Sequence, residues 1–256
     1  MQLASRAPHP ALRRHIRTLT GWHERADGPV ARDEFPGGRI VLVVSFGPRL
    51  EVDGRRYTSF AAGLHDGPAH TEHDGFGYGI QAYLTPLGAR RFFGMPMGEL
   101  TGRVVELEDL LGRQADELAE RLAGAPDWAA RLDLFEHAIA ERVLAAPPAA
   151  PELEWAWARL LQSRGAVPVG DLARELGWSR RHLAARFGAE LGMPPKALAR
   201  ILRFERAVER LRGGEELAAL ALDAGYYDQA HFNRDFRAFA GTTPTAYWPA
   251  VQSGAA

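Results

Sequence analysis

The sequence predicts an α+β protein, with a β-rich N-terminal domain that ends in helices and an all-helical C-terminal domain built from two repeated helix-turn-helix units and a linker helix. Strand-like runs lie between residues 39 and 85, whereas apolar residues recur three and four positions apart from residue 107 onward. The segment AAPPAAP at 145–151 can neither continue a helix nor bury much surface. We therefore expect one domain over residues 1–146 and another over 152–250.

Composition narrows the class of protein. Of the 256 residues, 46% are hydrophobic and 25% charged, which is usual for a globular chain. No apolar run is long enough to cross a bilayer, and the first residues lack the apolar core of a secretory signal, so we expect a cytoplasmic protein with no membrane partner. The absence of cysteine excludes disulfides, thiolate zinc sites and a cysteine nucleophile.

In the N-terminal domain, RIVLVVSF at 39–46 and YGIQAYLT at 78–85 are predicted strands because they are rich in β-branched and aromatic residues. Asp53-Gly54 stands between RLEV and RRYTSF and predicts a hairpin, since both residue types tolerate positive φ. The periodic stretches at 107–124 and 127–145 predict two helices.

The C-terminal domain contains two similar segments, 169–191 and 217–238, each a short helix, a glycine turn, a capping residue and a second helix. Gly177 and Gly225 stand where the first helix must end in a left-handed conformation. Ser179 and Asp228 can then accept the free N–H groups of the second helix. Apolar residues four apart on the second helices face the core: Leu183, Phe187, Phe232 and Phe236.

Residues 195–212 predict the linker helix, which carries five arginines beside an apolar face. A stiff connector of this kind would hold two recognition helices at a fixed separation, and about 34 Å would let both enter successive major grooves of DNA. The chain has a net charge of −1, but residues 174–212 carry 10 basic and 4 acidic residues, a net of +6. Such a segment can face phosphates, although charge alone favours a solvated helical face.

Residues 153–248 resemble the DNA-binding domain of the AraC/XylS family of transcription regulators. The closer match is ALALDAGYYDQAHFNRDFRAFAGTTPTAYW, which ends on Gly241, Thr243, Pro244 and Tyr247, and Gly192-Met193-Pro194 before the linker helix also fits. PLGARRFFGMPMGELTGRVVELEDLLG resembles the N-terminal part of a poorly characterised group of such regulators. The resemblance implies a sequence-specific regulator that binds double-stranded DNA and RNA polymerase. Its N-terminal domain would sense a small-molecule effector or form a homodimer, and no cofactor is implied.

The resemblance also implies the residues that contact DNA. Base contacts in the first unit would come from Arg181 and His182, with Ser179 and Arg180 nearby. Those in the second unit would come from Gln229, His231, Asn233 and Arg234. Arginine can pair with guanine, and glutamine or asparagine with adenine.

Contacts to phosphate are expected from Arg180, Lys196 and Arg200. The first unit departs from the family pattern at Ala185, where a polar or basic residue is common. Together with Ala184 it can touch thymine methyl groups instead. Arg186 follows, where an apolar residue is common, so the residues of the first unit that contact bases stay open.

Three other clusters have a functional and a structural interpretation. His65, His70 and His73, with the acids around them, suggest a metal site in a cupin-like barrel, but the usual His-x-His spacing is absent and the stretch is more typical of a polar loop. Arg90 and Arg91 suit an anionic effector, although an amphipathic surface helix is favoured. The aromatic group is typical of core or interface residues rather than of a cavity lining: Trp22, His23, Trp128, Trp155 and Trp157.

Two other functions compete with ligand-controlled DNA binding. Some proteins with this DNA-binding domain repair alkylated DNA by accepting methyl groups on cysteine, and the lack of cysteine removes that chemistry. We find no nucleophile and base pair with meaningful spacing, so we expect no enzymatic activity. Alternatively, the N-terminal domain serves only as an oligomerisation scaffold.

Overall fold

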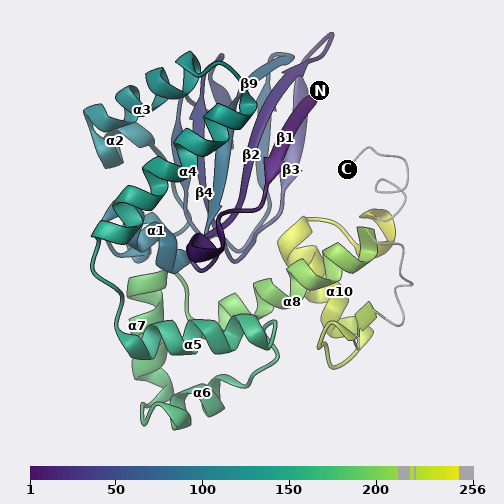
Figure 1. Ribbon diagram of the computed structural model, residues 1–256. Coiled ribbons are helices and arrows are strands. Elements are labelled where there is room, and N and C mark those ends of the chain that lie inside the picture. The colour runs from purple at the N-terminus through teal and green to yellow at the C-terminus, as the bar shows by residue number, and fades with distance from the viewer. Residues whose placement is uncertain (213–219, 222, 248–256) are drawn as a thin grey trace.

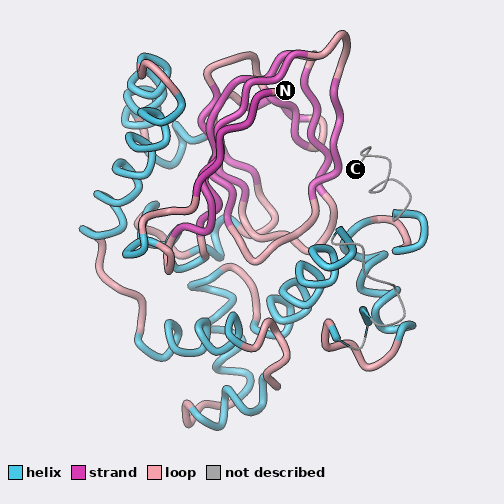
Figure 2. Tube along the Cα trace, turned by 45° about the vertical axis from the view of Figure 1, so that its right-hand side comes forward, coloured by secondary structure: helices cyan, strands magenta, loops and turns pink. Residues whose placement is uncertain are grey.

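The computed structural model describes residues 1–212, 220–221 and 223–247. Its N-terminal part consists of two antiparallel sheets that face one another (Figure 2). The six-stranded sheet has the order β1 (Gln2–Arg6), β2 (Ile16–Arg25), β9 (Phe76–Leu84), β4 (Ile40–Ser45), β7 (Phe60–Ala62) and β10 (Val104–Glu106). The four-stranded sheet has the order β3 (Val30–Glu34), β8 (Ala69–His73), β5 (Leu50–Val52) and β6 (Arg55–Tyr57). The α+β class is confirmed, with open sheets in the β-rich part.

The strands predicted over 39–46 and 78–85 are β4 and β9, which pair antiparallel from Ile40 opposite Leu84 to Ser45 opposite Gly79. The predicted hairpin joins β5 to β6, and Asp53 and Gly54 have φ values of 48° and 78°. The sequence did not predict β1, β2 or β3, because polar residues dilute the apolar alternation in all three.

The prediction of a polar loop over DGPAHTEHDG, residues 66–75, is wrong for residues 69–73. Residues 69–73 form β8, which pairs with β3 on one side and β5 on the other. The ladder satisfies the backbone of this polar stretch, while His73 is buried at the end of the strand. Tertiary pairing thus overrides a composition that is typical of loops.

Helices cover the outer side of the six-stranded sheet (Figure 1). The long helix α4 (Trp128–Ala145) packs on β2, where Gly21 leaves room for the ring of Trp128. The helix predicted over 107–124 is divided at Gly112 (φ 57°) into α2 (Leu107–Leu111) and α3 (Arg113–Gly124). Two short 3₁₀ helices, η1 (Pro10–Leu12) and η2 (Met97–Leu100), lie at turns.

Helix α1 (Pro86–Phe93) corrects the expectation of a surface helix around Arg90 and Arg91. Six of its eight residues are buried, and it packs on α4 and on α7 of the C-terminal part. Arg90 pairs with Glu190, and Arg91 donates to the carbonyl of Ala146 at 2.6 Å. Both guanidinium groups therefore join parts of the chain that are distant in sequence.

The C-terminal part is helical: α5 (Pro151–Gln162), α6 (Val169–Glu175), α7 (Arg180–Leu191), α8 (Pro195–Arg212) and α10 (Gln229–Ala240). The linker helix α8 has the predicted range. Residues 217–219 and 222 of the second predicted unit, and residues 248–250 of the predicted domain, lie outside the described residues. One hydrophobic cluster runs without a break from the six-stranded sheet to α10, so the two parts share a core. None of the helices in the described ranges is long and apolar enough to cross a membrane.

Candidate nucleic-acid interface and ligand cavity

The first reading head consists of residues 169–191, in which α6 is followed by a turn and by the recognition helix α7. Gly177 has φ 68°, and the Ser179 hydroxyl accepts a hydrogen bond from the backbone N–H of His182 at 3.1 Å, as predicted. Leu183 and Phe187 are fully buried, as predicted. Because these two residues fix the inner face of α7, the predicted contacts lie on the outer face and are exposed: Ser179, Arg180, Arg181, His182 and Ala185.

The second reading head covers residues 217–238, of which 220–221 and 223–238 are described. Gly225 has φ 87°, and the Asp228 carboxylate accepts from the backbone N–H of His231 at 2.6 Å. Phe232 and Phe236 are buried as predicted. Of the predicted contacts, His231 is half-buried and the others are exposed: Gln229, Asn233 and Arg234.

The two heads share a feature that the sequence analysis missed. In each, the aromatic residue after the turn glycine contacts a histidine on the recognition helix edge to face. Trp178 and His182 have ring centroids 4.6 Å apart at 84°, and Tyr226 and His231 have centroids 5.2 Å apart at 86°. The repeated Gly-aromatic dipeptide, each time followed by a histidine, was the available signal.

Arg200 and Lys196 lie in different surroundings. Arg200 of α8 binds the buried carboxylate of Asp235 on α10 through Nη2 at 2.8 Å and Nε at 3.2 Å, and its guanidinium lies 4.9 Å from the Phe239 ring centroid. The hydrogen bond to Asp235 raises the pKa of Arg200 above its usual value. The structure therefore places Arg200 at the joint between α8 and α10, whereas Lys196 is exposed.

Tyr227 is a further surface residue that the sequence analysis passed over. It is 87% exposed, which is the largest value among the large apolar side chains of the described chain. It directly precedes the capping residue Asp228, and so lies at the start of the second recognition helix.

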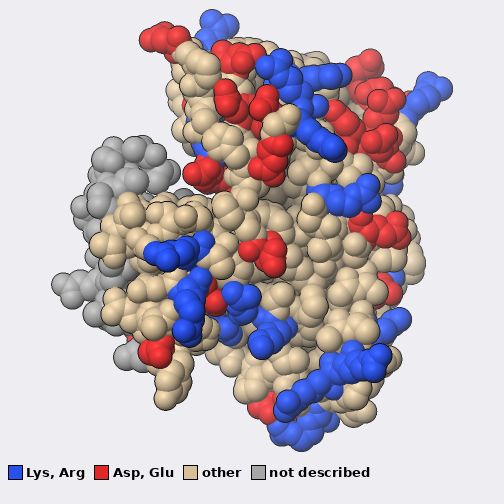
Figure 3. Space-filling view, turned by 180° about the vertical axis from the view of Figure 1, so that it is seen from behind, with Lys and Arg blue, Asp and Glu red and all other residues tan. Residues whose placement is uncertain are grey.

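Charge is distributed unevenly over the back of the molecule (Figure 3). Basic and acidic side chains are mixed over the upper, β-rich part, whereas basic side chains predominate at the lower end, where α6 and α7 lie. Asp171 and Arg174 pair on α6, while Arg186 is 4.0 Å from Glu190. Arg180 and Arg181 are exposed at this end of the molecule, which suits a surface that contacts phosphates.

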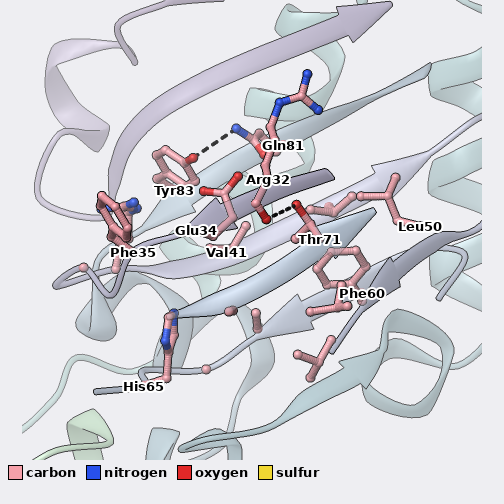
Figure 4. Close-up of a pocket in the computed structure, with 18 of the residues that line it drawn as sticks. Arg32, Glu34, Phe35, Val41, Leu50, Phe60, His65, Thr71, Gln81 and Tyr83 are labelled. Carbon is pink, nitrogen blue, oxygen red and sulfur yellow. Dashed lines mark hydrogen bonds between the residues drawn. The ribbon is translucent and has the colours of Figure 1, made fainter. Parts of the chain in front are cut away.

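A cavity of about 400 Å³ lies between the two sheets (Figure 4). Val43, Val52 and Phe60 form a small buried cluster that is separate from the main core. Partly buried apolar residues surround this cluster, and all of the following also line the cavity: Trp22, Val41, Leu50, Ala62 and Val104. A concave apolar space with a few polar groups is the usual form of a small-molecule site.

Polar groups lie at two places on the cavity wall. At one, Glu24 accepts from Arg32 at 2.7 Å and contacts His73 Nε2 at 3.0 Å. Burial raises the pKa of Glu24, but the hydrogen bonds from Arg32 and His73 outweigh this and leave the pKa lowered. At the other, the Gln81 amide donates to the Tyr83 hydroxyl at 3.2 Å. These groups can orient a bound molecule.

The aromatic and histidine residues for which the sequence suggested a function are divided between the core, the cavity wall and the surface. Trp157 is buried in the core and Trp128 packs on β2, as expected, but Trp22 lines the cavity. His65 and His73 line the cavity as well, whereas His70 is exposed and lies 3.0 Å from Asp33. Within the described ranges no group of three or more histidine or acidic residues is arranged to hold a metal ion.

Comparisons with known proteins give two matching domain families and several similar solved structures. Residues 172–248 match the model of a helix-turn-helix domain family, and residues 4–106 match a domain of unknown function, DUF6597. The chain is similar to ToxT from Vibrio cholerae O395, with 10% identity, 97% of this chain and 98% of that chain covered, and a TM-score of 0.48. It is also similar to the AraC-like transcriptional activator CuxR, with 17% identity, coverage of 81% and 86%, and a TM-score of 0.29. No curated protein matches the chain.

The C-terminal match covers both recognition helices, α7 and α10, within residues 172–248. The chain carries an AraC-type helix-turn-helix domain behind an N-terminal DUF6597 domain. A helix-turn-helix domain is a DNA-binding module.

Proposed function

We propose that the protein binds two successive major-groove segments on one face of DNA, with α7 in one groove and α10 in the next. The observation that carries this proposal is the repeated construction of the heads. Each recognition helix begins on a side-chain cap, buries two aromatic or aliphatic residues, and leaves its outer face exposed. The 18-residue helix α8 joins the two heads and would keep their separation constant.

In this proposal Arg181 and His182 contact bases in the first groove, with Ser179, Arg180 and Ala185 beside them. Gln229, His231, Asn233 and Arg234 do so in the second, and Lys196 contacts phosphate. The exposure of these side chains supports the assignment, except for the half-buried His231. The packing of Arg200 on Asp235 favours a positioning role for Arg200 over the phosphate contact that the sequence suggests.

We further propose that residues 1–146 form a sensor domain and residues 152–250 the DNA-binding domain. The sensor ligand is a small and largely apolar molecule bound between the sheets, which the apolar lining of the cavity supports. RNA polymerase and a second copy of the chain are the proposed protein partners, the cytoplasm is the proposed location, and no enzymatic activity is proposed.

The test is a selection of duplexes from a random pool, followed by anisotropy titrations of the selected DNA at several salt concentrations. We expect a binding constant that falls steeply with salt and a clear preference over a scrambled duplex. Arg181→Ala and Asn233→Ala should each weaken binding by about 1–3 kcal/mol and relax the preference at separate positions. Binding that is indifferent to sequence would refute the proposal.

The alternative of a pure oligomerisation scaffold has its own test. Sedimentation of the full chain at several concentrations reports its association state. Thermal shifts against a panel of small apolar compounds report ligand binding, because a molecule that binds the folded state raises the midpoint. Concentration-dependent association with no shift in the panel would favour the scaffold.

A further inference from the structure

One arginine of α8 contacts both halves of the DNA-binding part. Arg203 lies near the middle of α8, and its Nη1 donates to the carbonyl of Gly165 at 2.8 Å. Gly165 lies in the turn between α5 and α6 with φ 77°, and a Cβ atom there would overlap the carbonyl oxygen of Ala199 on α8. Only glycine lets this turn lie so close to α8. The hydrogen bond therefore ties the entrance of the first reading head to α8.

The same side chain packs on the turn of the second reading head. A Cβ atom at Gly225 would lie 3.3 Å from Arg203 Cδ, and the guanidinium lies 5.7 Å from the ring centroid of Tyr226. A guanidinium within about 6 Å of an aromatic ring is attracted to it. Tyr226 is buried, and its ring centroid lies 5.2 Å from that of His231 and 5.2 Å from that of Phe232. Arg203 thus contacts the residue against which the second recognition helix is oriented.

Arg203 differs in this respect from Arg200, which lies about one turn earlier on α8. The Arg200 guanidinium binds Asp235 and lies against Phe239, and both partners belong to α10. The Arg203 guanidinium instead donates to one head while it lies on a ring of the other. A planar guanidinium can do both at once, whereas the ammonium of lysine has no flat face to lay on a ring.

From this arrangement we propose that Arg203 is a positioning residue that sets the spacing of the two half-sites at which the protein binds DNA. One guanidinium joins the turn before the first head to the turn within the second. The inference rests on the proposed function, since it requires both heads to bind the same duplex. It assigns the rigidity of the two-headed unit to a side chain that lies away from the outer faces of the recognition helices.

Loss of Arg203 changes the spacing preference more than the binding of each head. The helix caps and the buried apolar pairs lie within the heads and do not involve Arg203. A rigidly held second head has a high effective concentration over its half-site at one spacing only. One inserted base pair moves that half-site about 3.4 Å along the duplex and about 35° around it. A second head that can move therefore binds less tightly at the selected spacing and tolerates shifted spacings better.

The DNA test uses the full chain, the selected duplex and two kinds of altered duplex. In one kind a single base pair is added or removed between the half-sites, and in the other kind one half-site is scrambled. For the wild-type chain we expect a changed spacing to lower the affinity about tenfold or more. Arg203→Ala should reduce this spacing penalty to about threefold or less, with the affinity for each single half-site within about twofold of wild type.

Arg159→Ala is the matched control. Arg159 Nη2 lies 3.9 Å from Glu175, and the guanidinium lies 5.9 Å from the Trp155 ring centroid, so these contacts stay on the side of the first head. This variant should keep the spacing penalty of wild type. Arg203→Lys keeps the charge and the stem and should give an intermediate penalty. It takes the place of Arg203→Ala if urea unfolding shows that the alanine variant does not fold.

A measurement without DNA follows the two heads directly. The chain has no cysteine, so Ala185→Cys on α7 and Ala238→Cys on α10 place one spin label on each recognition helix. Both positions are exposed. Double electron–electron resonance gives the distribution of distances between the labels. We expect a narrow distribution in the otherwise wild-type chain and with Arg159→Ala, and a clearly broader one with Arg203→Ala.

The two measurements separate the inference from the proposed function. An unchanged spacing penalty in Arg203→Ala, or equal losses for the full site and the single half-sites, would overturn the inference. A wild-type chain that binds all spacings equally well would do the same, as would a distance distribution that Arg203→Ala leaves as narrow as before. If the wild-type chain shows no sequence preference, it is the proposed function that fails. The distance distribution then still decides whether Arg203 fixes the heads relative to each other.

Discussion

At the scale of single residues, His182 and His231 are the most informative side chains. Each lies three positions after the cap of its recognition helix, and each ring rests against an aromatic ring supplied by the preceding turn. The aromatic residue limits the directions in which the histidine can point. The exposed His182 ring is thus oriented before DNA arrives, which reduces the conformational entropy lost on binding, whereas His231 is half-buried and its Nε2 lies 3.8 Å from Asp235 Oδ2.

We predict that Trp178→Leu lowers the affinity for selected DNA about threefold to tenfold while the chain stays folded. The reason is that an edge-to-face aromatic contact contributes about 0.5–1.5 kcal/mol, and its loss frees His182. Anisotropy titrations measure the effect. In a cycle with His182→Ala, the two losses should not add, since Trp178 acts through the histidine, and additive losses would contradict the prediction.

Tyr227→Ala should weaken DNA binding without lowering stability. The exposed Tyr227 ring contributes little to the stability of the folded chain. At the start of α10, however, it can contact the sugar-phosphate backbone or a thymine methyl group. We expect a loss of about 1 kcal/mol in affinity, on the scale of a single good contact to DNA. Leu144→Ala is the control, because Leu144 is 64% exposed on α4. Equal effects of both changes would argue against a contact by Tyr227.

At the scale of elements, the pair of Asp235 and Arg200 fixes α10 against α8. Asp235 is 4% exposed and accepts hydrogen bonds from both Nε and Nη2 of the guanidinium. Removal of either partner leaves a poorly solvated charge, which costs more than the pair itself contributes. The pair thus sets the orientation of the second recognition helix without touching its outer face.

Asp235→Ala should lower the free energy of unfolding by about 2 kcal/mol, a value reduced from that of a fully buried pair because Arg200 is partly exposed. Urea unfolding measures this loss.

DNA titrations separate the two roles of the basic residues. Lys196→Ala should reduce the salt dependence by about one phosphate contact, whereas Arg200→Lys should leave it unchanged. A reduced slope for Arg200→Lys, in which the charge is kept, would be inconsistent with a purely positioning role.

Some elements could be predicted from the sequence because local signals suffice. The turn glycines, the caps and the apolar pairs of both heads follow from propensity and spacing, as does the range of α8. The hairpin at Asp53-Gly54 follows from turn chemistry. In contrast, β8 and the buried position of α1 depend on partners distant in sequence, and so does the pairing of Arg39 with Glu205. No local pattern carries information of that kind.

At the scale of the whole molecule, His15 links stability to pH. It is 3% exposed in the turn directly before β2, and its backbone carbonyl accepts a hydrogen bond from the backbone N–H of Thr85 before α1. Burial lowers its pKa to about 4, and the charges of Arg91 and Arg14 add to this effect. The folded chain therefore keeps His15 neutral at a pH at which the unfolded chain binds a proton.

The sign of the effect follows from this difference. Between the unfolded pKa of 6.5 and the folded value of about 4, only the unfolded state is protonated, so the free energy of unfolding falls as the pH is lowered. We expect His15 to account for a loss of about 2–3 kcal/mol by pH 4. Urea titrations at several pH values should show a shallower decline in His15→Gln than in His137→Gln, whose histidine is exposed. Parallel profiles would contradict the prediction.

The continuous core described above also bears on how such proteins diversify. Buried side chains of the sheet domain and of the helices pack in a single cluster. A β-rich N-terminal domain exchanged between relatives would have to bring a matching apolar face for α5 and α8, or else leave apolar surface exposed to water. An exchange of domains that joins two chains at the proline-rich segment 145–151 therefore also depends on core side chains far from that segment. Chimaeras should aggregate unless the residues opposite Trp157 and Leu202 are transferred with the module.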